Sequence, residues 1–209
     1  LSNVLIGEVW LLSGQSNMEM QLSGWSDAPV EGSAQAINSA SLPNIRLITV
    51  NKKSASSPES DILNNPNTQW VECSPNTARN FSAVGFFFGR ELHKNLNIPI
   101  GLVNSSWGGS SCETWAEKSS LDFVTDYANN GPWQSKDGND NQTATVLYNG
   151  MIAPIVPFNF AGVCWYQGET NVGRSEQLTE LFPAMIEGWR NIFQKENLPF
   201  YFVQLAPWG

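Results

Sequence analysis

The strongest constraint on the fold is a series of short apolar runs separated by segments of helical spacing. Five runs stand out, at Val9–Leu12, Asn44–Val50, Ile98–Asn104, Phe160–Tyr166 and Pro199–Leu205. The first, Val9–Leu12, is an almost uninterrupted apolar run, which is typical of a strand covered on both faces. We therefore predict that these runs form the strands of a parallel sheet.

Helical patterns occur between the runs, at Gly32–Asn38, Phe81–Lys94, Ala144–Ile155 and Glu176–Glu196. Trp70–Pro75 indicates a small strand or sheet edge, 51–67 an exposed loop, and the polar segment 117–143 an insertion. The alternation predicts an α/β fold, a flavodoxin-like three-layer α/β/α sandwich with a five-stranded parallel sheet. A length of 209 residues suits a single domain.

Ser16 is the first candidate for chemistry. Gly14 permits a sharp turn at the carboxyl end of the first strand, the edge of a parallel sheet where ligands bind. A serine there can be a nucleophile, or it can simply cap a helix with its hydroxyl group. On local grounds the two interpretations are equally supported. They also overlap, because free amides at a helix start can stabilise an oxyanion.

Two other strand ends carry residues that suit acyl transfer. The adjacent glycines Gly108 and Gly109 follow the third strand, and Gln167 follows the fourth. Glycines after a strand can merely form a turn, or they can let backbone N–H groups approach a ligand. Carboxyl ends of parallel strands share one edge, so we expect these residues to gather near Ser16.

Three segments resemble the conserved blocks of one enzyme superfamily. Gly14–Met18, with the sequence GQSNM, resembles the nucleophile block of SGNH hydrolases as carried by sialate O-acetylesterases and related carbohydrate acetylesterases. Trp107–Ser110, with Glu113 and Trp115, resembles the second block, and Trp165–Asn171 resembles the third. The resemblance implies an SGNH hydrolase fold and an O-acetylesterase domain over residues 1–209, with Ser16 as its nucleophile.

The resemblance also implies roles for other residues. The oxyanion donors would be the backbone N–H of Ser16, that of Gly108 or Gly109, and the side-chain amide of Gln167. Glu169 would either be a buried carboxylate that holds the nucleophile loop, which we favour, or would orient a catalytic histidine. Supporting roles are expected for Gln15, Asn17 and Asn171, and substrate contacts for Glu113 and Trp115.

The general base is missing from this picture. The one histidine, His93, lies near the end of the Phe-rich helical segment, a usual place for a solvated histidine. The family's base lies in a D-x-x-H block after the last strand, whereas the sequence stops at Gly209. Either the chain is a piece of a longer protein, truncated after its fifth strand, or it is a degenerate relative. We prefer the first, and expect this chain alone to lack its catalytic His and Asp.

Composition limits the partners. A formal net charge of -8 argues against nucleic acid or an anionic membrane as the main partner. No apolar segment approaches the roughly 20 residues needed to span a bilayer. The nine tryptophans can serve the core or the apolar faces of sugars, and composition does not divide these roles. An anionic sugar would need local cations, and no arginine can be assigned to that task.

Cysteine usage and triplet motifs bear on the cell compartment. Cys73, Cys112 and Cys164 form no C-x-x-C pair, so we predict neither a zinc site nor a dense disulfide framework, and leave one disulfide with a spare thiol open. The esterase chemistry that the resemblance implies needs no metal or cofactor. N-x-S/T triplets begin at Asn80, Asn104 and Asn141, of which Asn104 is a poor glycan acceptor because it ends an apolar run. We expect a secreted, periplasmic or lumenal location, with an upstream segment removed.

These observations lead to one main functional expectation. The chain is expected to belong to a serine esterase that removes O-acetyl groups from carbohydrate, with sialic acid esters favoured, through an acetyl-enzyme on Ser16. One alternative is an acetylxylan esterase of the same superfamily. The other is a catalytically dead relative that binds carbohydrate.

Overall fold

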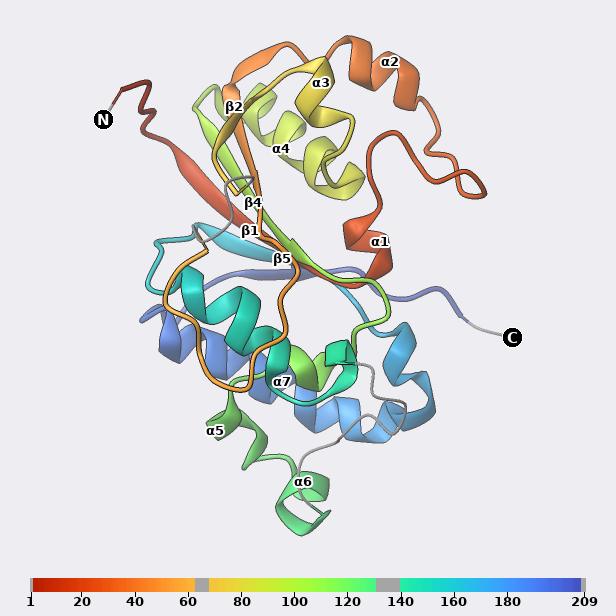
Figure 1. Ribbon diagram of the computed structural model, residues 1–209, viewed down its shortest axis with the longest axis vertical. Coiled ribbons are helices and arrows are strands. Elements are labelled where there is room, and N and C mark those ends of the chain that lie inside the picture. The colour runs from red at the N-terminus through yellow and green to blue at the C-terminus, as the bar shows by residue number, and fades with distance from the viewer. Residues whose placement is uncertain (1, 63–67, 131–139, 208–209) are drawn as a thin grey trace.

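The computed structural model describes residues 2–62, 68–130 and 140–207, and it is built around one mixed sheet (Figure 1). The strands follow the order β3-β2-β4-β1-β5-β6 across the sheet. Their bounds are β1 (Glu8–Gly14), β2 (Leu42–Thr49), β3 (Val71–Cys73), β4 (Ile100–Ser106), β5 (Gly162–Tyr166) and β6 (Phe200–Phe202). All five predicted parallel strands are present, and β3 adds an antiparallel edge strand paired with β2. The sheet therefore has six strands, not five.

The predicted α/β class is confirmed, while the strand order differs from that of flavodoxin. In the flavodoxin order the first two strands are neighbours. Here β4 lies between β1 and β2, and β1 pairs in parallel with both β4 and β5. The register places Gly14 opposite Ser106 on one side and opposite Tyr166 on the other. Consequently, the carboxyl ends of β1, β4 and β5 lie side by side.

Helices cover both faces of the sheet, one group on each side (Figure 1). On one face lie α1 (Ser16–Glu19), α2 (Ser33–Asn38), α3 (Pro75–Ala78) and α4 (Ala83–Leu96). On the other lie η1 (Cys112–Trp115), α5 (Lys118–Leu121), α6 (Thr125–Asn130), η3 (Tyr148–Ile152), η4 (Ala153–Ile155) and α7 (Ser175–Ile192). The chain changes face after β4, so the carboxyl edge of the sheet has a topological switch point, the place where such folds bind ligands.

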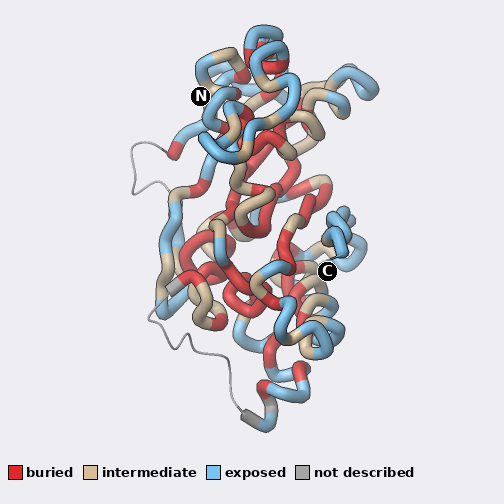
Figure 2. Tube along the Cα trace, turned by 90° about the vertical axis from the view of Figure 1, so that its right-hand side faces the viewer, coloured by how far each residue is buried: buried red, intermediate tan, exposed pale blue. Residues whose placement is uncertain are grey.

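Two hydrophobic cores result from the alternation of side chains along the strands. Leu11 packs into the core under α7, whereas Trp10 and Leu12 pack into the core under α4. Buried residues accordingly run through the centre of the molecule, where the strands lie (Figure 2). This explains why Val9–Leu12 of β1 is an unbroken apolar run in the sequence.

Helix α4 follows the sequence signals closely. The Ser82 hydroxyl accepts the N–H of Gly85 at 3.1 Å and so caps the first turn. Asn97 ends the helix in the left-handed conformation, with φ of 53°. An added Cβ at Gly85 would lie 2.2 Å from Leu12 Cδ1, so this glycine permits close packing of α4 on β1. The helix and β1 are therefore held in a fixed relation.

Two predicted segments differ from the structure. The predicted helix over 144–155 is a π-helical turn, η3, followed by the 3-10 helix η4. The predicted polar insertion 117–143 contains α5, α6 and the 3-10 helix η2 (Asp140–Gln142), and its residues 131–139 lie outside the described ones. Residues 63–67 of the predicted loop also lie outside them. Throughout the described ranges, no helix combines the length and apolarity needed to cross a membrane.

The cysteines and two of the three triplet asparagines are buried. All three cysteines are free thiols, so the disulfide left open by the sequence is absent. Burial raises the pKa of the Cys73 thiol to about 11 and that of Cys164 to about 12, which keeps both protonated near neutral pH. Asn104 and Asn141 are 5% and 8% exposed, whereas Asn80 is exposed. Of the triplets, only the one at Asn80 presents its asparagine at the surface.

Replacing Gly14 with alanine should destabilise the fold. A Cβ there would lie 2.1 Å from the Tyr166 backbone oxygen, and the φ of +138° is rarely adopted by other residues. Strand β1 or β5 would have to move, so we expect the free energy of unfolding to fall by roughly 2–4 kcal/mol in urea denaturation. Gly173→Ala is the matched control, since nothing lies within 4 Å of its added Cβ, and it should change stability by less than about 0.5 kcal/mol. Equal losses in both variants would contradict this account.

Candidate active site

Ser16 lies at the carboxyl edge of the sheet, as the sequence predicted. It is the first residue of α1, directly after the Gly14 turn, and is half-buried. The Gln15 N–H donates to the Tyr166 backbone oxygen at 2.9 Å, which fixes the turn against β5. Within the described residues, neither the N–H nor the hydroxyl of Ser16 has a hydrogen-bond partner. Both groups therefore remain available to a ligand.

The loop after β5 supports the nucleophile segment. The Gln15 side-chain oxygen accepts the N–H groups of Gly168 and Thr170 at 3.2 and 3.4 Å. The Asn17 amide donates to Glu169 Oε1 at 2.6 Å. Glu169 is exposed rather than buried, so the expectation of a buried carboxylate is wrong, although its bond does tie the nucleophile helix to this loop. The first and third sequence blocks are thus joined by side-chain bonds.

Nearly every backbone polar group of the loop 107–110 has a partner. The Trp107 N–H donates to the Gly14 oxygen, and the Gly108 N–H donates to Glu19 Oε2. Asn141 Nδ2 donates to the Gly108 oxygen at 2.8 Å, and Gln142 Nε2 to the Gly109 oxygen at 3.0 Å. The Ser110 N–H donates to the Trp107 oxygen, and the Ser110 oxygen accepts from Gln167 Nε2. The loop is therefore held by α1, by the segment at Asn141 and Gln142, and by the loop after β5.

Gly109 keeps the one N–H of this loop that bonds to no described residue. Its φ is +74°, a conformation that favours glycine, and the residue is exposed. Buried backbone groups are almost always paired, so an unpaired N–H at an exposed edge is free for a ligand. Of the two glycines predicted as oxyanion donors, Gly109 is the one whose N–H is not already used.

Gln167 and Asn171 form a buried polar cluster beneath the site. Gln167 Nε2 donates to the Ser110 oxygen at 3.1 Å and to Asn171 Oδ1 at 2.8 Å. Asn171 also accepts the Cys112 N–H at 2.8 Å. Both hydrogens of the Gln167 amide are thereby occupied in this arrangement, and the amide holds the glycine loop to the loop after β5.

The predicted substrate contacts Glu113 and Trp115 lie inside the protein, each 0% exposed. Glu113 accepts hydrogen bonds from Asn171 at 3.0 Å and from Arg174 at 2.6 Å. Burial lowers the pKa of Arg174, but attraction and hydrogen bonding to Glu113 outweigh it, so the pKa is raised. The Trp115 indole N–H donates to Ser110 Oγ at 2.9 Å. Neither side chain reaches the surface, so the prediction that Glu113 and Trp115 contact the substrate directly is wrong. Their hydrogen bonds instead support the loops of the site.

His93 lies away from this site. It is near the end of α4, and its Nδ1 is 2.7 Å from the oxygen of Ile98, which precedes β4. Ser16 lies beyond the opposite end of the adjacent strand β1. The full length of a seven-residue strand, roughly 20 Å, separates the two edges. This position agrees with the expectation that His93 is not the catalytic base.

The structure adds two charged residues that the sequence analysis did not single out, Glu19 and Lys52. Glu19 lies one helical turn after Ser16, and its Oε1 is 2.5 Å from Lys52 Nζ. The Lys52 ammonium also lies 5.6 Å from the centre of the Trp107 ring. The spacing of Glu19 from Ser16 on a short helix was a usable signal. No sequence signal predicted that Lys52 would lie at the carboxyl edge of the sheet.

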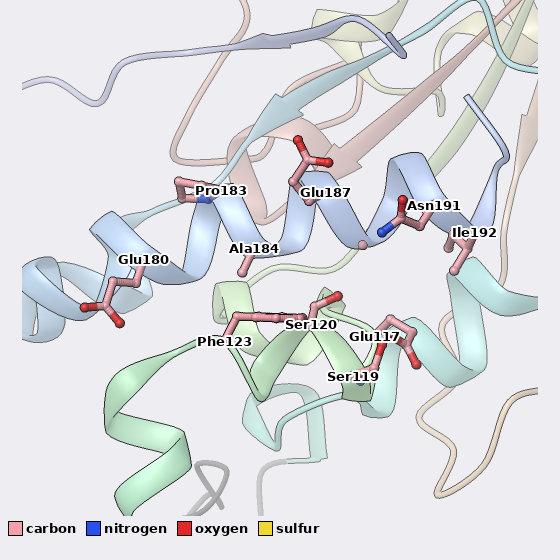
Figure 3. A pocket seen from close by; sticks show the side chains of 11 residues that line it. Glu117, Ser119, Ser120, Phe123, Glu180, Pro183, Ala184, Glu187, Asn191 and Ile192 are labelled. Carbon is pink, nitrogen blue, oxygen red and sulfur yellow. Dashed lines mark hydrogen bonds between the residues drawn. The ribbon is translucent and has the colours of Figure 1, made fainter. Parts of the chain in front are cut away.

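A cavity of about 740 Å³ lies elsewhere, between α5 and α7 (Figure 3). Glu117, Ser120 and Glu180 are among the side chains that line it, and it includes no residue of the three site loops. Both glutamates already accept backbone N–H groups, from Ser119 and Thr125 respectively. Among the described residues, no three His, Cys, Asp or Glu side chains gather as a metal-binding group.

Comparison with known proteins identifies the family. The model of the carbohydrate esterase family of sialic acid-specific acetylesterases matches residues 6–208. Sialate O-acetylesterases from Pongo abelii and Homo sapiens are each 36% identical over an alignment 218 residues long, which covers 98% of this chain and 40% of the relative. The one from Mus musculus is 33% identical and is covered to 44%. The chain thus spans about two fifths of the length of the curated relatives it matches.

Two solved structures resemble this chain to different degrees. A carbohydrate acetylesterase from Xanthomonas citri aligns with a TM-score of 0.81 at 39% identity, covering 95% of this chain and 41% of that one. A protein from Arabidopsis thaliana aligns with a TM-score of 0.59 at 18% identity, which is a likeness of fold alone. The family match over nearly the whole sequence and the identity to curated relatives agree: the chain belongs to the carbohydrate esterase family of sialic acid-specific acetylesterases.

Proposed function

We propose that this chain is the nucleophile-bearing part of a serine esterase that removes O-acetyl groups from carbohydrate, with O-acetylated sialic acid as the favoured substrate. Ser16 Oγ attacks the acetyl carbonyl carbon and gives its proton to a base. The bond to the sugar oxygen then breaks, and that oxygen takes up a proton. Water hydrolyses the acetyl-Ser16 ester, releasing acetate and restoring the serine.

The observation that best supports this proposal is the position of Ser16 beside the glycine loop. A Cβ built on Gly108 would lie 3.5 Å from Ser16 Cβ, so the loop contacts the nucleophile. The N–H groups of Ser16 and Gly109 are unbonded to described residues and are the donors proposed for the oxyanion. Gln167 is a third donor only if its amide leaves Ser110 or Asn171, so its role in this proposal is chiefly to hold the loop.

A base is still required, because a serine hydroxyl is a weak nucleophile at neutral pH. The sequence holds one histidine, which lies at the opposite edge of the sheet. We infer that the base comes from outside these 209 residues. The names of the relatives and the family support the substrate class, acetylated carbohydrate.

Added imidazole should restore part of the missing proton transfer. We expect it to raise the hydrolysis of 4-nitrophenyl acetate by the chain about tenfold over the rate with Ser16→Ala, since a positioned base contributes about 10²–10⁴-fold. The measurement is the release of 4-nitrophenol at several imidazole concentrations. Subtracting the Ser16→Ala rate removes the hydrolysis caused by imidazole alone.

His93→Gln is the matched control, and its imidazole-dependent rate should equal that of the unmodified chain. Mass spectrometry should locate the acetyl group on Ser16 during turnover. Equal rates for the unmodified chain and Ser16→Ala at every imidazole concentration would reject the proposed nucleophile.

Substrate comparison separates the alternatives. With imidazole present, O-acetylated sialic acid should give a higher Ser16-dependent kcat/KM for acetate release than acetylated xylo-oligosaccharide. The opposite order would favour an acetylxylan esterase. Sugar binding that survives Ser16→Ala, together with no acetate release from either substrate, would instead indicate a relative that binds carbohydrate without catalysis.

A further inference from the structure

Glu19 connects the nucleophile helix to the glycine loop. Its Oε2 accepts the Gly108 N–H at 2.5 Å, and its Oε1 pairs with Lys52 Nζ at the same distance. The Glu19 side chain is 27% exposed, so water screens this carboxylate only in part. A charge-assisted bond to a backbone N–H is stronger than a neutral one, and here it joins residues far apart in the sequence.

This bond lies next to the nucleophile. A Cβ added to Gly108 would lie 3.1 Å from Glu19 Oε2 and 3.5 Å from Ser16 Cβ. Acyl transfer at Ser16 places a negative charge on the carbonyl oxygen of the substrate. An uncompensated carboxylate at this short range would oppose that charge by Coulomb repulsion. The contact that positions Gly108 therefore carries an electrostatic cost.

Lys52 offsets this cost. It follows the carboxyl end of β2, and its ammonium lies beside Glu19 and 5.6 Å from the centre of the Trp107 ring. The ring face attracts the cation, and Trp107 directly precedes Gly108. The Lys52 side chain is 43% exposed, and its contacts with Glu19 and Trp107 hold it in place. Glu19 and Lys52 together have no net charge.

We propose that Glu19 is a positioning residue that fixes Gly108 against Ser16, and that Lys52 cancels the charge of Glu19 where the oxyanion forms. The inference about charge rests on the proposed esterase function. Neither residue contacts the substrate in this account. The pair acts through the backbone of Gly108, which leaves the Gly109 N–H to face the reacting oxygen.

A double-mutant cycle tests the charge. Lys52→Met should lower the Ser16-dependent kcat for 4-nitrophenyl acetate about five- to tenfold with little change in KM, since the substrate is neutral. Glu19→Gln keeps an oxygen that accepts the Gly108 N–H, and should stay within about threefold of the unmodified chain. The double variant, Glu19→Gln with Lys52→Met, should return to that level because no charge remains to cancel.

Lys53→Met is the matched control. Lys53 is the next residue, and its ammonium pairs with Glu59 at 2.8 Å instead of with Glu19. It should leave kcat and KM unchanged. A double variant as slow as Lys52→Met would overturn the charge account and would indicate that Lys52 acts on the substrate or on Trp107. An unchanged rate in Lys52→Met would overturn it as well.

The tether itself is tested without activity. In a chain labelled with ¹⁵N-glycine, Glu19→Ala should move the Gly108 amide proton upfield and speed its exchange with solvent, whereas Glu19→Gln should have a smaller effect. An unchanged Gly108 resonance in Glu19→Ala would overturn the positioning role. If no Ser16-dependent rate is found in the unmodified chain, the proposed function and the catalytic role of the pair fail together, and the resonance alone decides the tether.

Discussion

The site depends on one buried carboxylate and the groups that satisfy it. Glu113 is 0% exposed, and it is bonded to Arg174 and Asn171, both of which follow β5. A buried charge without partners would be very unfavourable, so these bonds have to form with the fold. Through Asn171 the network continues to the Cys112 N–H and to Gln167. The segments after β4 and β5 are therefore locked together beneath the surface that carries Ser16.

Further hydrogen bonds hold the glycine loop beside Ser16, and one of them, from Gln167, belongs to the Glu113 network. Gln167 holds the Ser110 oxygen, Asn141 and Gln142 hold the two glycine oxygens, and Glu19 holds the Gly108 N–H. Preorganised donors stabilise developing charge better than mobile ones, because no reorganisation is needed during the reaction. A loop whose other polar groups are engaged presents its remaining N–H in a fixed direction. That N–H belongs to Gly109.

Much of this could be predicted from sequence because the signals are local. Buried parallel strands appear as apolar runs, and the turn at Gly14 delivers Ser16 whatever the rest of the chain does. The burial of Glu113 was not readable, since an acidic residue is usually exposed and its partner Arg174 lies 61 residues away. Strand β3 was recognised only as a possible edge, because three residues carry little pattern. Long-range pairing, rather than local preference, decided each of these cases.

The strand order explains the most distant contribution. With β4 between β1 and β2, the end of β2 lies next to the glycine loop rather than next to the nucleophile turn. Lys52, three residues past β2, can therefore contact Trp107 and Glu19 together. In a flavodoxin order β2 would adjoin β1, and the segment that carries Lys52 would start next to the Ser16 turn. In the observed order Lys52 comes from the strand next to the glycine loop, and its ammonium pairs with Glu19 on the nucleophile helix.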